Sequence, residues 1–354
     1  MQLEEIIKQI KPLNAAAMQA ARIRQDTLTK PRGSLGRLEE LSIQLAGITS
    51  YPLPSVERKT VIVMAADHGV TSEDVSAYPA EVTPQMVGNF LRGGAAINVL
   101  ARQANARVVV VDMGIATEID DPSRNLIRRR IGAGTANLAK GPAMTREQAM
   151  EAIQSGVEIA EGEIARGVDI LATGDMGIGN TTAASAIACA LMKEAPENIA
   201  GRGAGVDDDG LKRKISVIKR ALEVNKPNAD DSLDVLAKVG GFEIGGVAGV
   251  MLAAAANRKP VVVDGFISTA AAMIAFTLAP AVRDYMIAAH VSQERGHRLM
   301  LEWLELNPLL DMNMRLGEGT GAALAFHLIE ASARILREMA TFDEAGVSNK
   351  TSEV

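Results

Sequence analysis

The sequence predicts an α/β fold in which a doubly wound, mainly parallel sheet carries helices on both faces. Two observations predict it. From residue 59 onward, short β-branched runs alternate with segments of helix length, which is the order expected of strand–helix–strand units. These runs are also apolar without interruption, as strands are when both faces of a parallel sheet are covered. A helical segment of about fifty residues precedes this region.

The N-terminal segment is expected to form helices. Its first apolar residues recur at intervals of three and four up to Ile10, and Pro12 then ends the pattern. The segments that follow are a helix at Ala15–Leu28, a loop rich in Gly and Pro at 30–37, a helix at Leu38–Ala46 and a linker at 51–54.

Five strands are expected after this segment, the last being the least regular. They are Thr60–Ala65, Arg107–Val111, Val168–Ala172, Pro260–Val263 and Tyr285–Ala289. Polar residues and glycines follow each of them, at 67–69, 112–114, 174–182, 264–265 and 290–292. A single segment of this kind is typical of any loop or helix cap. Because the carboxyl ends of parallel strands lie at one edge, where helix N-termini converge, five together predict a binding site there.

The composition is that of a globular chain. Its 354 residues are 47% hydrophobic and 23% charged, which excludes a disordered protein. Aromatic residues make up only 3%, so close packing of helices rich in Ala, Gly and Met must replace ring-filled cores. The net charge of −6 argues against nucleic acid as a partner.

The cysteine and histidine residues of the chain exclude a disulfide framework and the commonest zinc sites. The single cysteine, Cys189, is expected to be a small core residue. The four histidines lack the spacing of a zinc site. We find neither a secretory signal nor an apolar run long enough to span a membrane, so a soluble, cytoplasmic protein is expected.

The segment Gly174–Thr182 carries the strongest local chemistry. Three glycines precede Asn180-Thr181-Thr182 and a helix of small residues, so free amides, hydroxyls and a helix dipole would face an anion. The plainer interpretation is a tight turn in which Thr181 or Thr182 caps the helix. No Gly-Lys-Ser/Thr follows the glycines, so this is not a nucleotide-binding P-loop.

A second glycine cluster, Leu316–Ala322, places Glu318 between two glycines before a helix expected at Ala322–Ile335. The residues before it do not form a buried strand, which excludes a dinucleotide-binding fingerprint. Glu318 is then either a residue at the start of a helix, favoured by the dipole, or an approachable general base. Spacing alone leaves both interpretations open.

The segment 201–210 is expected to be a loop that leads into a helix at Leu211–Leu222. Its three successive aspartates, 207–209, lack the alternate spacing of a calcium loop, and we interpret them as a solvated helix start. On the helix, Lys212, Arg213 and Lys214 offer cations that could reach a phosphate, although a solvated face is the simpler interpretation for each.

Taken together, these segments resemble the nicotinate-nucleotide–dimethylbenzimidazole phosphoribosyltransferase family. The resemblance spans nearly the whole chain in order. It is carried by Lys30–Glu39, Ala66–Val70, Tyr78–Met86, Gly93–Asn98, Gly134–Asn137, Gly174–Thr182 and Leu316–Ala322. The chain departs from the family pattern at Asp175, where glutamate is usual, and at Arg32, where a second proline is usual.

The resemblance implies transfer of a 5-phosphoribosyl group from nicotinate mononucleotide to 5,6-dimethylbenzimidazole, with no metal or other cofactor. It implies a homodimer whose chains each contain a large Rossmann-like catalytic domain (55–304) and a small helical domain (1–54 and 305–354). Glu318 matches the catalytic base, and Asp175 matches a second site carboxylate. The substrate-binding positions it implies are Gln85, Met176 and Leu316 for the base, and Gly177, Gly179, Asn180, Thr181, Lys214 and Ser292 in or near the phosphate segments.

This chemistry needs one carboxylate at the reacting centre. Nicotinate leaves as a neutral ring because its nitrogen is already cationic, whereas the incoming benzimidazole must lose its N–H proton. A glycoside hydrolase usually needs two carboxyl groups, because its leaving oxygen must be protonated. Two alternatives remain, a ribosyl hydrolase or transferase acting on purines or azoles and a nucleotide-sensing module without turnover. Release of nicotinate only when an azole is added would distinguish the transferase from both.

Overall fold

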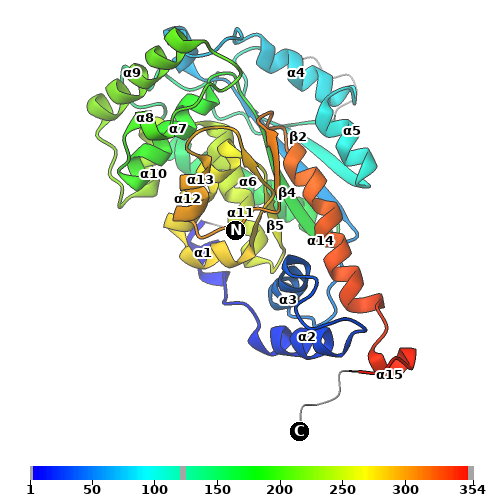
Figure 1. Cartoon of the computed structure of the whole chain (residues 1–354). Helices are drawn as coiled ribbons and strands as arrows, with labels where there is room; N and C mark the ends of the chain where they lie inside the picture. The colour runs from blue at the N-terminus through cyan, green and yellow to red at the C-terminus, as the bar shows by residue number, and fades with distance from the viewer. Residues whose placement is uncertain (1–2, 120–124, 350–354) are drawn as a thin grey trace.

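The computed structural model describes residues 3–119 and 125–349. Six strands form one sheet in the order β3–β2–β1–β4–β5–β6, and every neighbouring pair is parallel (Figure 1). The strands are β1 (Lys59–Ala66), β2 (Ala106–Gly114), β3 (Leu126–Arg128), β4 (Ile170–Met176), β5 (Val261–Val263) and β6 (Met286–Ala288). This is the strand order of Rossmann-type sheets, in which the topology reverses between β1 and β4.

The five expected strands are confirmed as β1, β2, β4, β5 and β6. Sequence reasoning missed β3, a three-residue strand at the sheet edge beside a run of arginines. It also missed a separate two-stranded parallel sheet of β7 (His290–Ser292) and β8 (Leu310–Met314). The strand β8 is mostly exposed, so it has no continuous apolar run to reveal it.

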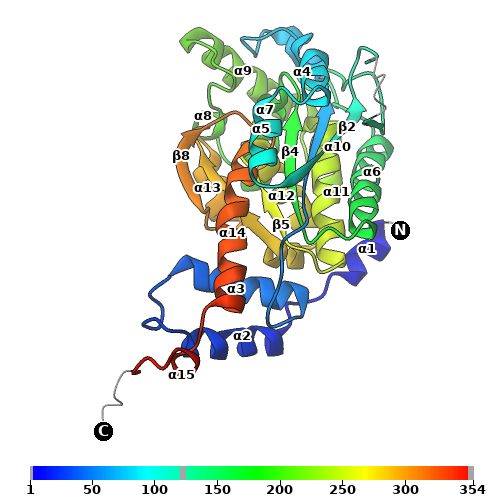
Figure 2. The same ribbon diagram turned by 90° about the vertical axis from the view of Figure 1, so that its right-hand side faces the viewer.

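Helices cover both faces of the sheet, as predicted (Figures 1 and 2). Successive residues of β1 point to opposite faces, so Ile62 and Met64 join one core while Val61 and Val63 join the other. The first core contains α6 (Arg146–Ala165), α7 (Asn180–Met192), α10 (Ser232–Val239), α11 (Phe242–Ala256) and α12 (Phe266–Leu278). The second contains α4 (Val82–Leu91), α5 (Ala96–Gln103) and α14 (Thr320–Glu338).

The remaining helices complete the described chain, and residues such as Leu41 and Val217 add to the two cores. These helices are α1 (Leu3–Gln9), α2 (Ala15–Thr27), α3 (Arg37–Thr49), α8 (Pro196–Ile199), α9 (Asp208–Asn225), α13 (His297–Trp303) and α15 (Phe342–Ala345), with 3₁₀ turns at Gly69–Glu73 and Pro280–Tyr285. In the described parts of the chain, no helix combines the length and apolar character needed to span a membrane.

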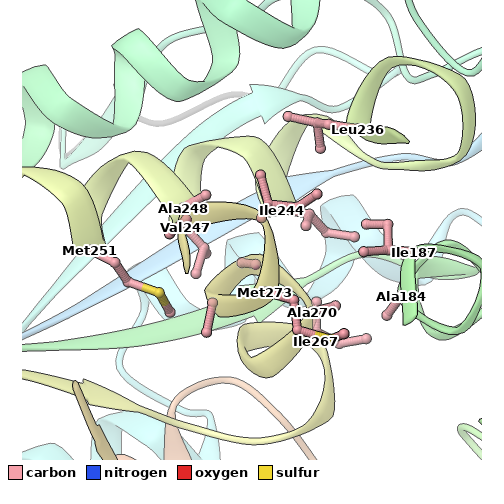
Figure 3. Close-up of a cluster of buried hydrophobic side chains, with 14 of the residues drawn as sticks. Ala184, Ile187, Leu236, Ile244, Val247, Ala248, Met251, Ile267, Ala270 and Met273 are labelled. Carbon is pink, nitrogen blue, oxygen red and sulfur yellow. The ribbon is translucent and has the colours of Figure 1, made fainter. Parts of the chain in front are cut away.

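Small side chains allow the first core to pack closely, which explains how the chain folds with few aromatic residues. Figure 3 shows alanine, isoleucine, leucine, valine and methionine side chains from α7, α10, α11 and α12 in one cluster. A Cβ atom at Gly249 of α11 would lie 2.0 Å from the Ile153 carbonyl oxygen of α6. At Gly156 of α6 it would lie 1.9 Å from the Gly246 carbonyl oxygen. Backbone therefore meets backbone where α6 and α11 cross.

Gly249→Ala is expected to destabilise the protein. The added methyl group meets a backbone oxygen that cannot rotate away, so the two helices must separate, at a cost of about 1–3 kcal/mol in the free energy of unfolding. Equilibrium unfolding in urea measures this cost. Gly162→Ala on α6, where the new Cβ has no heavy atom within 4 Å, is the control. Equal stability of the two variants would contradict the packing argument.

Helices from the N-terminal and C-terminal regions of the chain pack against each other. The helices α2 and α3 pack against the C-terminal part of α14, and the Arg24 guanidinium donates to the Leu336 carbonyl oxygen at 2.7 Å. Lys30 forms a buried ion pair with Glu39 at 2.7 Å inside the predicted loop and helix. By contrast, α1 packs on α11, and the first half of α14 covers the sheet. The proposed division into 1–54 with 305–354 and 55–304 stays a prediction.

Candidate active site

A cavity of about 580 Å³ lies at the carboxyl ends of the strands, where sequence analysis expected a site. Five segments distant in sequence surround it, at 75–86, 175–181, 203–204, 265–267 and 290–294, and a sixth at 315–318 closes it. The turn after β4 lies next to His68, which comes two residues after the end of β1. The cavity therefore opens beside the point where the sheet topology reverses.

The turn from β4 into α7 lines this cavity. Gly179 caps α7 with a left-handed backbone (φ +94°) and no side-chain cap bond, so the expectation that Thr181 or Thr182 is the cap is wrong. Gly177 lies so close to β1 that a Cβ would be 2.5 Å from the Ala66 carbonyl oxygen. Gly177, Gly179, Asn180 and Thr181 all line the cavity, and the N-terminus of α7 favours an anion there.

Lys214 of α9 lies behind this end of the cavity, in contact with Thr181, and does not itself line the cavity. It is fully buried, and its Nζ donates to Thr181 Oγ1 at 2.7 Å. Burial lowers the pKa of Lys214 to about 8, while the nearby Glu294 carboxylate acts in the opposite direction. Lys212 on the same helix is exposed and pairs with Asp209. The simpler interpretation, a solvated lysine, is therefore confirmed for Lys212 and wrong for Lys214.

The loop before α9 is a helix start, as expected. The Asp207 carboxylate accepts the Gly210 amide proton at 2.8 Å and caps α9. Asp208 and Asp209 are exposed and pair with Arg202 and Lys212. Among the residues that the structure describes, no group of three or more His, Cys, Asp or Glu side chains is arranged to hold a metal ion.

Glu318 projects from a strained turn between β8 and α14. Gly317, Glu318 and Gly319 all have left-handed backbones, with φ of +84°, +65° and +93°. A non-glycine residue in this region costs about 1–3 kcal/mol and persists only when its surroundings hold it. Gly174 makes the position possible, because a Cβ there would lie 2.4 Å from the Glu318 carbonyl oxygen.

The Glu318 carboxylate lines the cavity and is only 4% exposed as a residue. Its Oε2 accepts the Ile97 amide proton of α5 at 3.2 Å. Burial raises the pKa of Glu318, and the Asp264 carboxylate raises it further, while the Ile97 amide opposes both. Glu318 thus lines the cavity with its pKa raised, as a general base requires, while its carboxylate also accepts an amide proton in the first turn of α5.

Asp175 lines the same cavity as Glu318. It ends the buried part of β4 and accepts a hydrogen bond from Asn180 Nδ2 at 3.0 Å. Burial raises the pKa of Asp175 well above its usual range, and the negative charges of Asp264 and Glu243 add to the effect. Asp175 therefore keeps its proton to a higher pH than an ordinary aspartate does.

Apolar side chains complete the cavity. Met176 and Leu316 lie on its lining with Met86, Phe266 and Ile267. Leu316 is 58% exposed, so a flat apolar ligand would cover a side chain that otherwise faces water. An apolar slot, an anion-binding helix N-terminus and a basic carboxylate thus share one cavity.

A family model described as phosphoribosyltransferase matches residues 10–347 of the chain. The nicotinate-nucleotide–dimethylbenzimidazole phosphoribosyltransferase of Roseiflexus sp. (strain RS-1) is 61% identical over 349 residues, which are 98% of each chain. This chain belongs to the nicotinate-nucleotide–dimethylbenzimidazole phosphoribosyltransferase family. The enzyme of the same name from Geobacter metallireducens is 55% identical over 98% of each chain. The crystal structure of CobT from Thermus thermophilus matches with a TM-score of 0.91 and 50% identity, over 94% of this chain and 99% of that one.

The structure brings together most of the positions that the phosphoribosyltransferase resemblance implied. Ser292 lines the cavity, and its amide donates to His297 Nδ1 at 2.7 Å. Gln85 does not line it. Its side chain is exposed and faces a separate surface depression with Arg92 and Glu118, while the next residue, Met86, lines the cavity. A role for Gln85 in binding the base stays a prediction.

Sequence reasoning missed three buried polar residues in or behind this phosphoribosyltransferase site. His290 and Glu294 line the cavity, and Asp264 lies behind Glu318. The signal for His290 and Asp264 was present, since both belong to the polar groups at strand ends. Glu294 follows β7, and because no apolar run predicts that strand as a separate element, sequence alone did not mark it.

Proposed function

We propose that the chain catalyses transfer of the 5-phosphoribosyl group from nicotinate mononucleotide to 5,6-dimethylbenzimidazole, giving α-ribazole 5′-phosphate and nicotinate. The observation that carries this proposal is the carboxylate of Glu318, held in a left-handed turn and directed into a cavity with an apolar slot and an anion-binding end. Membership of the phosphoribosyltransferase family supports the same reaction.

The reaction exchanges one C–N bond for another at the anomeric carbon. The bond between C1′ and the nicotinate ring nitrogen breaks, and its electron pair neutralises that cationic nitrogen, so the leaving group needs no proton. A benzimidazole nitrogen attacks C1′ from the opposite face, which inverts the configuration. The proton on the other benzimidazole nitrogen passes to Glu318. General base catalysis of this kind contributes about 10²–10⁴-fold to the rate.

Alignment of the two rings supplies the larger share of the acceleration. The 5′-phosphate lies at the N-terminus of α7, beside Gly179, Thr181 and the Lys214 ammonium group that Thr181 contacts, and the base lies against Met176 and Leu316. Fixing both reactants in line across the sugar contributes about 7–11 kcal/mol. Asp175 lines the same cavity, and because burial raises its pKa it gives up its proton less readily than an ordinary aspartate does.

One assay separates this function from its alternatives. Nicotinate release from nicotinate mononucleotide is followed by chromatography with and without 5,6-dimethylbenzimidazole. The transferase releases nicotinate only with the azole present and forms an equimolar phosphorylated product. A ribosyl hydrolase releases nicotinate in water alone, and a sensing module binds the nucleotide without consuming it. No release with any benzimidazole would refute the proposal.

The homodimer and the cytoplasmic location remain part of this proposal. The resemblance to the family implies the dimer, and a phosphorylated nucleotide substrate, which membranes retain inside the cell, favours the location. Sedimentation equilibrium of the purified chain measures its mass, and a single species of monomer mass would contradict the dimer.

An alkaline limb is expected in the pH profile of kcat/KM for nicotinate mononucleotide. Lys214 binds phosphate only as the cation, and burial lowers its pKa to about 8, so the cation is lost as pH rises through this value. The constant kcat/KM reports ionisations of the free enzyme and should fall above about pH 8. Initial rates at low nucleotide concentration measure it. A profile that stays flat well above pH 8 would show that Lys214 does not bind the substrate as a cation.

A further inference from the structure

Asp264 lies directly behind the turn that carries Glu318. It follows the last residue of β5 and is 1% exposed. Its Oδ2 accepts the Gly319 amide proton at 3.2 Å, and its Oδ1 accepts the Ala322 amide proton at 2.8 Å. Both carboxylate oxygens are therefore occupied, one by the residue that precedes α14 and the other by a residue of its first turn.

These two bonds join the sheet to the residues on each side of the α14 start. Gly319 is the third residue of the left-handed turn, and Ala322 lies in the first turn of the helix. The N-terminal amides of a helix have no partners inside the helix, and here a carboxylate from another element accepts from one of them. Since Glu318 adjoins Gly319, fixing the Gly319 amide fixes the backbone from which the Glu318 side chain extends.

Asp264 also contributes charge to the site. Four titratable side chains face it or share its surroundings: His290 after β6, Asp175 at the end of β4, Glu243 on α11 and Glu318 itself. Burial raises the pKa of Asp264, while His290 and the α14 amides act in the opposite direction. The negative charge of Asp264 in turn raises the pKa of Glu318.

We infer that Asp264 is a positioning residue for the transfer reaction: its carboxylate holds the left-handed turn at 317–319 and thereby aims the Glu318 carboxylate at the incoming base. The inference deepens the proposed function and rests on the role that Glu318 has there. Asp264 does not line the cavity, and its hydrogen bonds act on the reaction through the turn that carries Glu318.

Asp264→Asn tests the inference. The amide keeps one acceptor oxygen, but its NH₂ group faces a backbone N–H and cannot accept, so one of the two bonds is lost together with the charge. Misplacing a catalytic group by about 1 Å costs on the order of 10²-fold. We expect kcat to fall by about 10²-fold with little change in KM for nicotinate mononucleotide, and the acid limb of the kcat profile to move to lower pH.

Asp112→Asn is the control for the loss of a buried charge at a strand end. Asp112 is also buried, its Oδ1 accepts two backbone amide protons, from Gly114 at 3.0 Å and Ile115 at 2.8 Å, and it does not line the cavity. The same substitution there should leave kcat and its pH profile unchanged. Equal losses in the two variants with an unmoved acid limb would overturn the inference, because the effect would then be a general loss of structure.

Two further measurements separate this inference from the proposed function. In a Glu318→Gln background, Asp264→Asn should reduce kcat little further, because its effect passes through Glu318. An inactive Glu318→Gln enzyme beside a fully active Asp264→Asn enzyme overturns this inference and leaves the proposed function intact.

If Asp264→Asn fails to fold, amide hydrogen exchange of the unaltered protein tests the inference instead. Core-like protection of Gly319 and Ala322 supports the inference, and exchange as fast as in an exposed loop overturns it.

Discussion

Glu318→Gln is expected to reduce kcat by about 10²–10⁴-fold, which is the range that a general base contributes. The amide has the shape of the carboxylate and keeps an oxygen that can accept the Ile97 amide proton, so the turn should be unchanged. What the variant loses is the capacity to take the benzimidazole proton. The KM for nicotinate mononucleotide should change little, since Glu318 lies away from the phosphate end of the cavity.

Stability separates this role from a structural one. Glu318 is a buried carboxylate whose pKa is raised by burial and by Asp264, so its charge opposes folding. Replacing it by a neutral amide should leave the midpoint of thermal unfolding unchanged or raise it, as happens when a functional group is strained for activity. The acid limb of the rate profile should vanish as well. A Glu318→Gln enzyme with unreduced kcat would refute the proposed proton transfer.

The sheet could be predicted because each buried strand leaves a pattern in its own short stretch of sequence. Each of the five expected strands is a short apolar run, and burial on both faces requires such runs. The edge strand β3 and the exposed strand β8 need no apolar run, and both were missed. The site was predicted at the correct edge for a similar reason, because the strand ends carry their polar residues in sequence.

The environment of individual side chains was not predictable in this way. Lys212 and Lys214 are two positions apart on one helix, yet Lys214 alone turns inward to meet Thr181 from another element. Asp264 looks like an ordinary loop residue until the sheet and α14 are assembled around it. Burial and long-range hydrogen bonds depend on tertiary packing, which no local pattern encodes. Those two residues are the ones whose roles the structure changes most.

Lys214→Met is expected to lower kcat/KM for nicotinate mononucleotide by about 10–10²-fold. Hydrogen bonds to charged groups contribute about 1.5–3 kcal/mol, which corresponds to this range of rate constants. The alkaline limb near pH 8 should disappear with the ammonium group. Lys212→Met is the control on the same helix, and because Lys212 is exposed it should leave the rate constant unchanged.

A substrate without the phosphate makes the test specific. Methionine fills a similar volume without a charge, so the variant should fold at least as well as the original protein, whose buried Lys214 ammonium is costly to desolvate. Nicotinate riboside reacts through the same ring and sugar but has nothing for Lys214 to hold. We therefore expect Lys214→Met and the original enzyme to have equal kcat/KM for the riboside. If the variant were slower with both substrates by the same factor, Lys214 would act on the structure of the cavity and not on the phosphate.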